Sequence, residues 1–373
     1  MTCQRCDLLI VLTSLAAEGC PQLVLQLTRH WNRQGVVVHL VVLSREPLDL
    51  LAEFEALGVP IHWFDLSHGL GRYPRLAWLT FRLCRLQRPR AVLSFPLGWH
   101  SLIAIGARAA GVRRVCAHVG NLPPVWTGSA FAKFKLLVQL GRPFTHRLLC
   151  CSEYVRTATV RDFSLSRRET RAIFNACDLK AFSGISRPET FHDPPRLAMV
   201  ARLELHKDQP TLIRASAVLR DRGVAVEVKL VGDGSQREQL EELIAELDLA
   251  DRVHLLGMRR DVPELLGQID LFVFAARPDE GFGIALAEAM AAGVPIVATD
   301  VGACREVLQG GRLGRLGAPG DPLALAAGIL EVLAEPEAAA ERAILARQRA
   351  LRDFTVESMA MAYGRELGMM ATG

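Results

Sequence analysis

The chain has 373 residues, of which 50% are hydrophobic and 23% charged, and its 44 basic and 40 acidic residues leave a formal net charge of +4. This length suggests two domains, the composition is that of folded globular proteins, and the near balance of charge is no signature of a nucleic-acid-binding protein. No apolar run reaches the ~18 residues of a transmembrane helix, so we expect no integral membrane protein, although attachment to a membrane surface stays open.

The first half of the chain alternates strand-like apolar runs with helix-length segments, the pattern of a parallel, doubly wound α/β sheet. Residues 8–17 are apolar enough to resemble a secretion signal, but Asp7 opens the run and Arg5 is the single basic residue before it, so we expect a buried first strand. The expected strands are 8–12, 36–42, 61–64, 91–94, 114–117 and 148–151, and the expected helices are 21–34, 47–57, 72–87, 99–110, 128–140 and 152–160.

The alternation breaks after Asp178, and residues 183–195 are polar with three prolines, the composition of a linker. We therefore predict a first Rossmann-like domain at 1–182, a second at 196–355 and a C-terminal helix at 356–373 that packs back on the first. The expected strands of the second domain are 196–200, 224–231, 253–256, 270–274 and 295–298, and the expected helices are 208–222, 235–247, 261–267, 283–292 and 321–333, with further helix over 335–369.

Residues 279–295, DEGFGIALAEAMAAGVP, are typical of a turn and a short buried helix after an apolar strand. Backbone N–H groups at such a helix start can bind an anion, and Gly281 and Gly283 would let a phosphate approach closely. Glu280 and Glu288 would flank that anion, which suits a nucleotide-sugar with hydroxyl groups on both sides of its pyrophosphate. The alternative is that Glu280 only interacts with the helix dipole and that Glu288 is solvated.

Two cations follow the first strand of the second domain, in the sequence ARLELHK. Arg202 and Lys207 would face the same cleft as the Glu280 helix, because ligands of doubly wound sheets bind at the carboxyl ends of the strands. Arg can hold a diphosphate with two hydrogen bonds, and Lys supplies a point charge; the alternative is two solvated surface cations. The turn VGDG at 231–234 is a further tight connection, and residues 259–261 could form a wall of a nucleobase pocket.

The nine cysteines show no pattern of a metal site. Cys3 and Cys6 form one CxxC motif, and no second pair accompanies it. Most of the others lie in apolar runs, as reduced core cysteines do. We therefore expect no bound metal and a reducing, cytosolic compartment.

Five motifs follow each other along the chain in the order FNACDLKAF, ARLELHK, VGDG, EGFGIALAE and AEAMAAGVPIVATDVGACREVL. Together they resemble the retaining glycosyltransferases of family four, a group 1 glycosyltransferase family with the GT-B fold, in which two Rossmann-like domains face each other across a donor-binding cleft. The resemblance covers nearly all of the second domain and, more loosely, the first.

The resemblance implies a metal-independent hexosyltransferase that moves a sugar from a nucleotide-sugar, a UDP- or GDP-sugar, to a saccharide or lipid-linked saccharide acceptor with retention of anomeric configuration. Such enzymes make cell-surface polysaccharides or glycolipids. Cations and helix N–H groups would stabilise the leaving nucleoside diphosphate in place of a metal ion, and no separate cofactor is expected. The leaving phosphate would help to deprotonate the acceptor.

The resemblance also implies a role for each matching residue of the second domain. Arg202 and Lys207 would hold the donor pyrophosphate and stabilise the leaving group. Glu280 would contact hydroxyl groups of the donor sugar, and Glu288 would hold the ribose. Backbone contacts to the sugar and phosphate would come from Phe282, Gly283 and Ile284.

In the first domain, the resemblance places His118, in AHVGN after the fifth strand, near the donor sugar and the reacting centre; otherwise it simply ends a strand. The family usually has a Gly-rich loop after the first strand, where this chain offers Gly19 alone, so an approach of Gly19 to the donor is a weaker prediction. Ala201 and Asp208 also stand where the family commonly has glycine, and neither change removes a charge.

Acceptor choice should depend on the first domain. Residues 72–90 hold six arginines, and 131–147 is a second basic and apolar stretch. One helix face in the first stretch would carry Leu76, Leu79, Leu83 and Leu86. These segments could rest on the inner, anionic surface of a membrane and reach a lipid-linked acceptor. The simpler interpretation is that the leucines pack on the sheet and the arginines are solvated.

Other functions fit the same fold. A non-catalytic protein could bind a nucleotide-sugar or a protein partner, an epimerase would need acid and base carboxylates in the cleft, and a two-domain solute-binding protein would need an export signal. The presence of Arg202, Lys207, Glu280 and Glu288 together favours the transferase. We expect a cytoplasmic enzyme that binds no nucleic acid, with a peripheral membrane contact as an open question.

Overall fold

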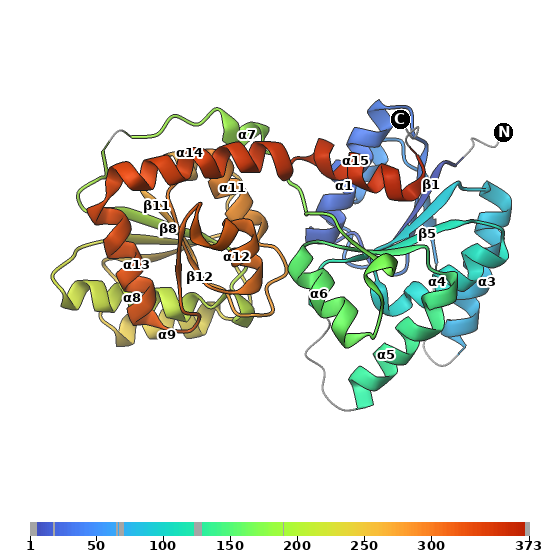
Figure 1. Ribbon diagram of the computed structural model, residues 1–373, viewed down its shortest axis with the longest axis horizontal. Helices are drawn as coiled ribbons and strands as arrows, with labels where there is room; N and C mark the ends of the chain where they lie inside the picture. The colour runs from blue at the N-terminus through green and yellow to red at the C-terminus, as the bar shows by residue number, and fades with distance from the viewer. Residues whose placement is uncertain are drawn as a thin grey trace. The chain divides into compact units, whose positions relative to one another are not determined.

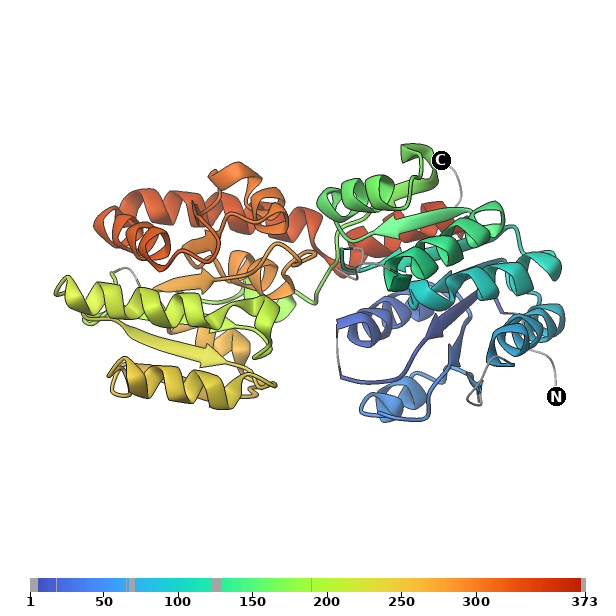
Figure 2. The ribbon, with the colours of Figure 1, turned by 90° about the horizontal axis from the view of Figure 1, so that it is seen from below.

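The structure is a computed structural model, and it describes residues 6–17, 19–64, 66, 71–122, 129–188 and 190–369. Cys3 of the CxxC motif and the last four residues of the predicted C-terminal helix lie outside this part. Contacts divide the chain into a first unit, Met1–Ala176 with Val356–Gly373, and a second unit, Cys177–Thr355 (Figure 1). Each unit is a parallel sheet with helices on both sides (Figure 2), so the predicted pair of Rossmann-like α/β domains is confirmed.

The sheet of the first unit has strand order β3-β2-β1-β4-β5-β6-β7, and every pairing is parallel. β1 pairs with β2 on one side and β4 on the other, so the strand order reverses there, as at the ligand-binding edge of doubly wound sheets. The strands are β1 (Leu8–Leu12), β2 (Val38–Val42), β3 (Ile61–Trp63), β4 (Ala91–Ser94), β5 (Arg114–Val119), β6 (Arg147–Cys150) and β7 (Thr170–Ala172).

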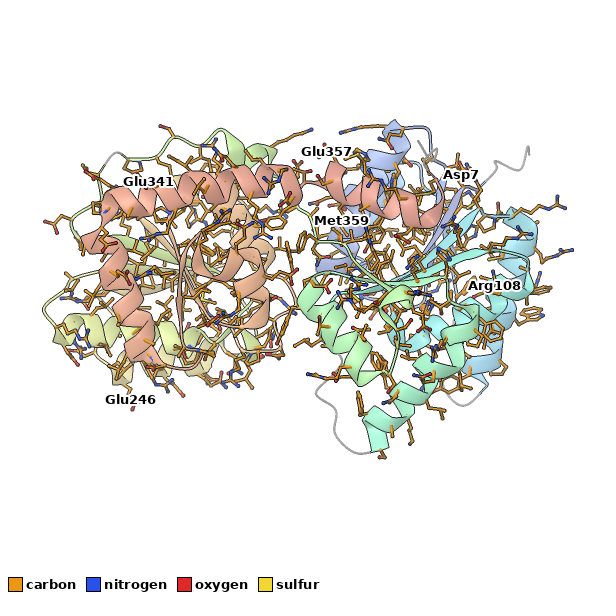
Figure 3. The ribbon with its side chains drawn as sticks, viewed as in Figure 1. Asp7, Arg108, Glu246, Glu341, Glu357 and Met359 are labelled. Atoms are coloured by element: carbon orange, nitrogen blue, oxygen red, sulfur yellow. The ribbon has the colours of Figure 1, made fainter. Side chains whose placement is uncertain are left out.

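Helices cover both faces of this sheet because successive side chains of each buried strand point to opposite faces. Ile10 packs in one core with α1 and α15, while Leu9 and Val11 pack in the other with α3 and α4. Met359 of α15, labelled in Figure 3, belongs to the first of these cores. The helices are α1 (Gly19–Arg33), α2 (Leu51–Ala56), α3 (Arg72–Gln87), α4 (Leu97–Ala109), α5 (Ser129–Gly141), α6 (Glu153–Asp162) and α15 (Val356–Leu367).

The sheet of the second unit has order β10-β9-β8-β11-β12-β13, again all parallel, and reverses at β8. Its strands are β8 (Arg196–Val200), β9 (Glu227–Val231), β10 (Val253–Gly257), β11 (Leu271–Phe274), β12 (Ile296–Thr299) and β13 (Arg315–Gly317). Its helices are α7 (Lys180–Ser183), α8 (Gln209–Asp221), α9 (Arg237–Glu246), α10 (Val262–Gly267), α11 (Ile284–Ala292), α12 (Gly302–Val307), α13 (Pro322–Ala334) and α14 (Pro336–Asp353).

The structure adds elements that the sequence pattern did not predict. β7 and β13 are short edge strands whose sequences, TRA and RLG, contain no run of apolar residues to mark them. The helix expected over 335–369 is broken at residues 354–355, where Phe354 is fully buried and its carbonyl accepts a hydrogen bond from the Cys177 N–H group. Consequently α14 belongs to the second unit and α15 to the first.

The segment expected as a linker, 183–195, lies in the second unit by its contacts. Arg187 donates hydrogen bonds to the carbonyl groups of Leu266 and Ile269, at 3.2 and 2.7 Å. His192 adds a contact between its Nδ1 atom and the carboxylate of Asp270 at 2.8 Å. No helix in the described part of the chain is both long and apolar enough to cross a membrane.

Candidate functional site

The predicted cations and Glu280 lie in two loops at the carboxyl ends of β8 and β11, which are neighbours in the sheet of the second unit. Arg202 lies two residues after β8, Lys207 ends a short 3-10 turn, Leu205–Lys207, and Glu280 lies just before α11. The Arg277 N–H group donates to the His206 carbonyl at 3.0 Å, which ties the two loops together. The strand ends therefore bring Lys207 next to Glu280.

Lys207 and Glu280 form an ion pair that is almost closed to solvent. The Lys207 ammonium group donates to Oε2 of Glu280, and the side chains are only 17% and 9% exposed. Oε1 of Glu280 accepts from the backbone N–H groups of Phe282 and Gly283, at 3.3 and 3.0 Å. Burial alone would raise the pKa of Glu280, but Lys207 and these N–H groups outweigh it, so the pKa is lowered and the carboxylate stays charged at neutral pH. The pair places fixed positive and negative charge at the start of a helix.

The start of α11 requires glycine at position 283. Gly283 has φ of 81°, in the left-handed region that other residues rarely adopt, and a Cβ atom there would lie 3.1 Å from the Phe274 ring. The same Phe274 ring lies 5.7 Å from the Lys207 Nζ atom. Phe282 is buried and its ring meets Phe354 edge to face at 5.2 Å. A small residue thus lets the helix start lie directly beside the ion pair.

Glu288 is partly exposed, as are Ile284 and Ala285, whereas the other residues of α11 are buried. Burial raises the pKa of Glu288 to about 7. A carboxyl group with this pKa is ready to ionise when hydrogen-bond donors, such as sugar hydroxyl groups, arrive. It is therefore not the fully solvated residue of the alternative interpretation.

The loop that carries Arg202 is supported by the VGDG turn. A Cβ atom on Gly232 would lie 2.0 Å from the Ala201 carbonyl oxygen, and one on Gly234 would lie 2.5 Å from the Leu203 carbonyl oxygen. These glycines are needed for close backbone packing, with φ of 139° and 158°. The VGDG turn therefore packs directly against the backbone of the loop that carries Arg202.

Asp208, where the family commonly has glycine, has φ of 48°, in the left-handed region. Asp tolerates this conformation better than most residues, and its carboxylate accepts a hydrogen bond from the Thr211 hydroxyl group at 2.8 Å. The departure from glycine therefore keeps the local backbone. Arg202 is exposed at the surface of the same loop, and its carbonyl accepts from the Gln209 side chain at 2.7 Å.

His118 belongs to the first unit, on β5, and is buried. Its Nδ1 atom and the Tyr363 hydroxyl group of α15 are 2.7 Å apart, and burial lowers the pKa of His118 to about 4, so the ring is neutral at pH 7. The Nε2 atom is also buried and has no hydrogen-bond partner in the described part of the chain. A Cβ atom on Gly120 would lie 2.8 Å from Nε2, so only glycine leaves the ring this room.

Gly19, the weaker prediction, is exposed at the first residue of α1 in the first unit. The predicted site residues thus fall into two sets, His118 and Gly19 on the first unit and the remaining seven on the second. Sequence reasoning missed two partners, Lys207 for Glu280 and Tyr363 for His118. Tyr363 lies 245 positions from His118, and no local pattern marks it.

Comparisons with known proteins match both halves of the chain. Residues 184–349 match the family described as "Glycosyl transferases group 1", and residues 18–181 match "Glycosyltransferase Family 4".

Among the described residues of the first unit no group of three metal-binding side chains forms a site, and the same holds for those of the second.

Similar curated proteins include an enzyme of polysaccharide biosynthesis and a glycogen synthase. An amylovoran biosynthesis glycosyltransferase, AmsK, of Erwinia amylovora is 30% identical over 58% of this chain and 51% of its own length. A glycogen synthase of Mycobacterium tuberculosis is 32% identical over 58% of this chain and 52% of its own length. The chain thus spans about half the length of these curated relatives. Among solved structures, Anabaena Alr3699/HepE in complex with UDP has a TM-score of 0.84 with 21% identity, over 98% of this chain and 100% of that one, and this shows the GT-B fold.

Proposed function

The chain belongs to the group 1 glycosyl transferases, and we propose that it moves a hexosyl group from a nucleotide-sugar to a saccharide or lipid-linked saccharide. The observation that carries this proposal is the arrangement around α11. The nearly buried Lys207–Glu280 ion pair joins the loop after β8 to the start of α11. Gly283, which begins this helix, and the half-buried Glu288 lie in the same turn and helix as Glu280.

Each residue receives a role from its position. The helix start and the cations Arg202 and Lys207 suit the pyrophosphate of the donor, because N–H groups and cations there attract phosphate oxygens. Glu288, whose pKa is raised to about 7, suits the two hydroxyl groups of a ribose. Glu280, with Phe282, Gly283 and Ile284 beside it, is assigned to the transferred sugar and its phosphate. His118 and Gly19 are assigned to the reacting centre and the donor approach from the first unit.

The chemistry follows from charge development. Breaking the bond between sugar and phosphate leaves negative charge on the phosphate oxygens, and preorganised cations and N–H groups lower the barrier for that change. We propose retention of anomeric configuration without a metal ion, with the leaving phosphate accepting the acceptor proton. NMR identification of the anomer in the product tests this proposal, and an inverted product would contradict it.

The donor is proposed to be a UDP- or GDP-sugar. The structurally similar Anabaena protein was crystallised with UDP, which supports the first of these. A thermal-shift screen against UDP-, GDP-, ADP- and dTDP-sugars measures binding, because a ligand at 100 times its Kd adds ~2.7 kcal/mol of stability. We expect a rise of roughly 5–10 °C in Tm for one nucleotide class.

A matched control makes the screen specific for the proposed site. In the Lys207→Met variant the shift caused by the preferred nucleotide-sugar should shrink, whereas in a Lys229→Met variant, on the strand β9, it should persist. If none of the four classes raises Tm in the unmodified protein, the nucleotide-sugar proposal is refuted. Seven of the eight described cysteines are buried, as reduced core cysteines are, which supports the proposed cytoplasmic, reducing location.

A further inference from the structure

We propose that the outer surface of α3 and α5 in the first unit docks on an anionic membrane. Residues 66–152, which contain both helices, include 13 Lys and Arg residues and no Asp or Glu residue. The second unit, in contrast, has 28 acidic residues against 21 basic ones. The small net charge of the whole chain therefore conceals one segment whose charge is entirely positive.

The exposed side of α3 carries a stripe of arginine and tryptophan. Arg75, Trp78, Arg82 and Arg85 are exposed and follow each other at spacings of three and four residues, which places them on one helix face. The Trp78 side chain is 52% exposed, and the Arg82 guanidinium group lies 4.6 Å from the centre of its ring. Among the described residues no carboxylate pairs with the arginines of this stripe.

The membrane hypothesis from the sequence used the leucine face of α3, but most of these leucines do not face solvent. Leu76 and Leu83 are buried in the core between α3, α4 and the sheet, so they cannot contact a membrane. Leu86 is the exception, because it is 67% exposed beside Arg85 at the end of the helix. The stripe of arginine and tryptophan, and not the leucine face, is therefore the surface available for docking.

α5 adds an apolar element to the same helical layer. Leu136 and Leu140, one turn apart, are 59% and 55% exposed, and Lys133 is exposed beside them. α4 lies between the two helices: its Ser101 donates a hydrogen bond to the Leu137 carbonyl of α5, and a Cβ atom on its Gly106 would lie 2.2 Å from a backbone oxygen of α3. The exposed sides of α3 and α5 therefore flank one covered helix.

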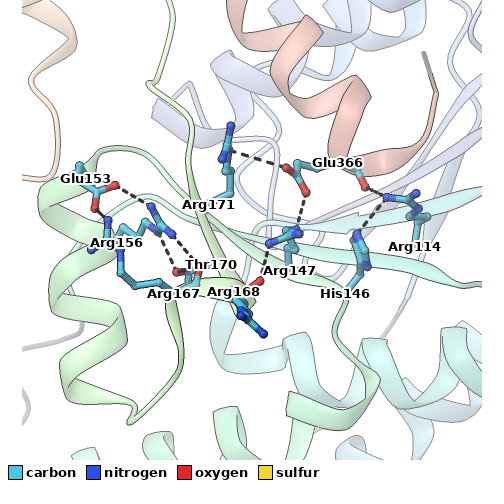
Figure 4. A network of polar contacts seen from close by, with 10 residues as sticks. All are labelled: Arg114, His146, Arg147, Glu153, Arg156, Arg167, Arg168, Thr170, Arg171 and Glu366. Carbon is cyan, nitrogen blue, oxygen red and sulfur yellow. Dashed lines mark hydrogen bonds and ion pairs between the residues drawn. The ribbon is translucent and has the colours of Figure 1, made fainter. Parts of the chain in front are cut away.

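Other arginines of the first unit are held by internal contacts. Figure 4 shows Arg147 and Arg171 converging on Glu366 of α15, with Nε atoms 2.8 and 3.9 Å from its carboxylate. The Glu366 carbonyl accepts a further hydrogen bond from Arg114 at 3.0 Å. These contacts fix the C-terminal helix to the sheet, and Glu366 compensates part of the charge of Arg147 and Arg171. The arginines of the α3 stripe have no such carboxylate beside them among the described residues.

The combination of cations with exposed Trp and Leu side chains favours a lipid surface over a soluble polyanion. Arg attracts the anionic headgroups, and Trp and Leu gain by entering the boundary between headgroups and acyl chains. α5 follows β5, the strand that carries His118, so docking would hold the proposed catalytic edge of this unit near a lipid-linked acceptor. That last benefit rests on the proposed function, whereas the docking itself does not.

The test is co-sedimentation of the full-length protein with vesicles of phosphatidylcholine, with and without phosphatidylglycerol, at low and high salt. We expect binding only to the anionic vesicles, weakened by salt. The double variant Arg75→Gln/Arg82→Gln should lower the partition coefficient roughly 30-fold, from the contribution of each Arg near an anionic surface. Arg29→Gln/Arg33→Gln is the matched control, because both residues are exposed on α1, on the opposite face of the same sheet.

Three results would overturn the proposal. They are failure of the unmodified protein to bind anionic vesicles at low salt, equal losses in the two double variants, and unchanged binding of a Trp78→Ala/Leu136→Ala variant, which would leave only a non-specific attraction to negative charge. The assay involves no turnover, so its outcome is independent of whether the transferase proposal holds.

Discussion

Replacing Glu280 separates its contribution to the fold from its contribution to sugar transfer. In Glu280→Ala the nearly buried Lys207 loses its counter-ion, and the Phe282 and Gly283 N–H groups lose their acceptor. Removing one partner of a buried ion pair costs ~3–5 kcal/mol. For a unit of this size each kcal/mol lowers Tm by about 2–4 °C, so we expect a fall of roughly 10 °C.

In Glu280→Gln the amide oxygen can still accept from both N–H groups, but the ion pair with Lys207 is lost as in Glu280→Ala. We expect a loss of stability that is ~1–2 kcal/mol smaller than that of Glu280→Ala, because the two backbone N–H groups keep their acceptor. Transfer should nevertheless fall by at least ~100-fold, the size expected when one preorganised charge contact is removed. The contrast between the two variants distinguishes unfolding from loss of chemistry.

The measurements are Tm by scanning fluorimetry and initial rates of sugar transfer, with Asp279→Asn as the control for loss of a neighbouring, more exposed carboxylate. The double variant Lys207→Met/Glu280→Gln should recover part of the lost stability, since no charge is then left unpaired. Near-normal turnover of Glu280→Gln would refute the catalytic assignment. An unchanged Tm of Glu280→Ala would refute the structural one.

Three further predictions address other parts of the site. The pKa of Glu288 is raised to about 7, so it is protonated at lower pH; affinity for the donor should rise with pH up to about 7 and then level off, and isothermal titration with the Glu288→Gln variant should show no such dependence. Tyr363→Phe removes the hydrogen bond to His118, so the ¹⁵N chemical shifts of the His118 ring should change, with unchanged shifts speaking against a fixed tautomer. Gly232→Ala should destabilise the second unit by more than Gly223→Ala, where φ is also positive, at 77°, but no atom lies within 4 Å of the Cβ position; equal urea midpoints would count against the packing argument.

Much of the second unit follows from the sequence, because its strands are continuous apolar runs and its turns are marked by glycine. The run before residue 279 predicted β11, and the glycine at 283 predicted the start of α11, where the left-handed φ permits little else. Cations and carboxylates after neighbouring parallel strands were expected at one sheet edge for the same reason. The short edge strands β7 and β13 were not predicted because their sequences, TRA and RLG, contain no run of apolar residues.

Tertiary structure alone decided how the side chains are paired. The sequence assigned Lys207 and Glu280 to different parts of a ligand, whereas folding makes them partners of each other. It marked Glu288 as a carboxylate, but only its burial in α11 raises its pKa. On α3 the leucine period indicated an amphipathic helix, and packing decided that Leu76 and Leu83 face the core while Trp78 faces solvent. Periodicity in a sequence determines which residues share a face, and contacts between distant segments determine what that face meets.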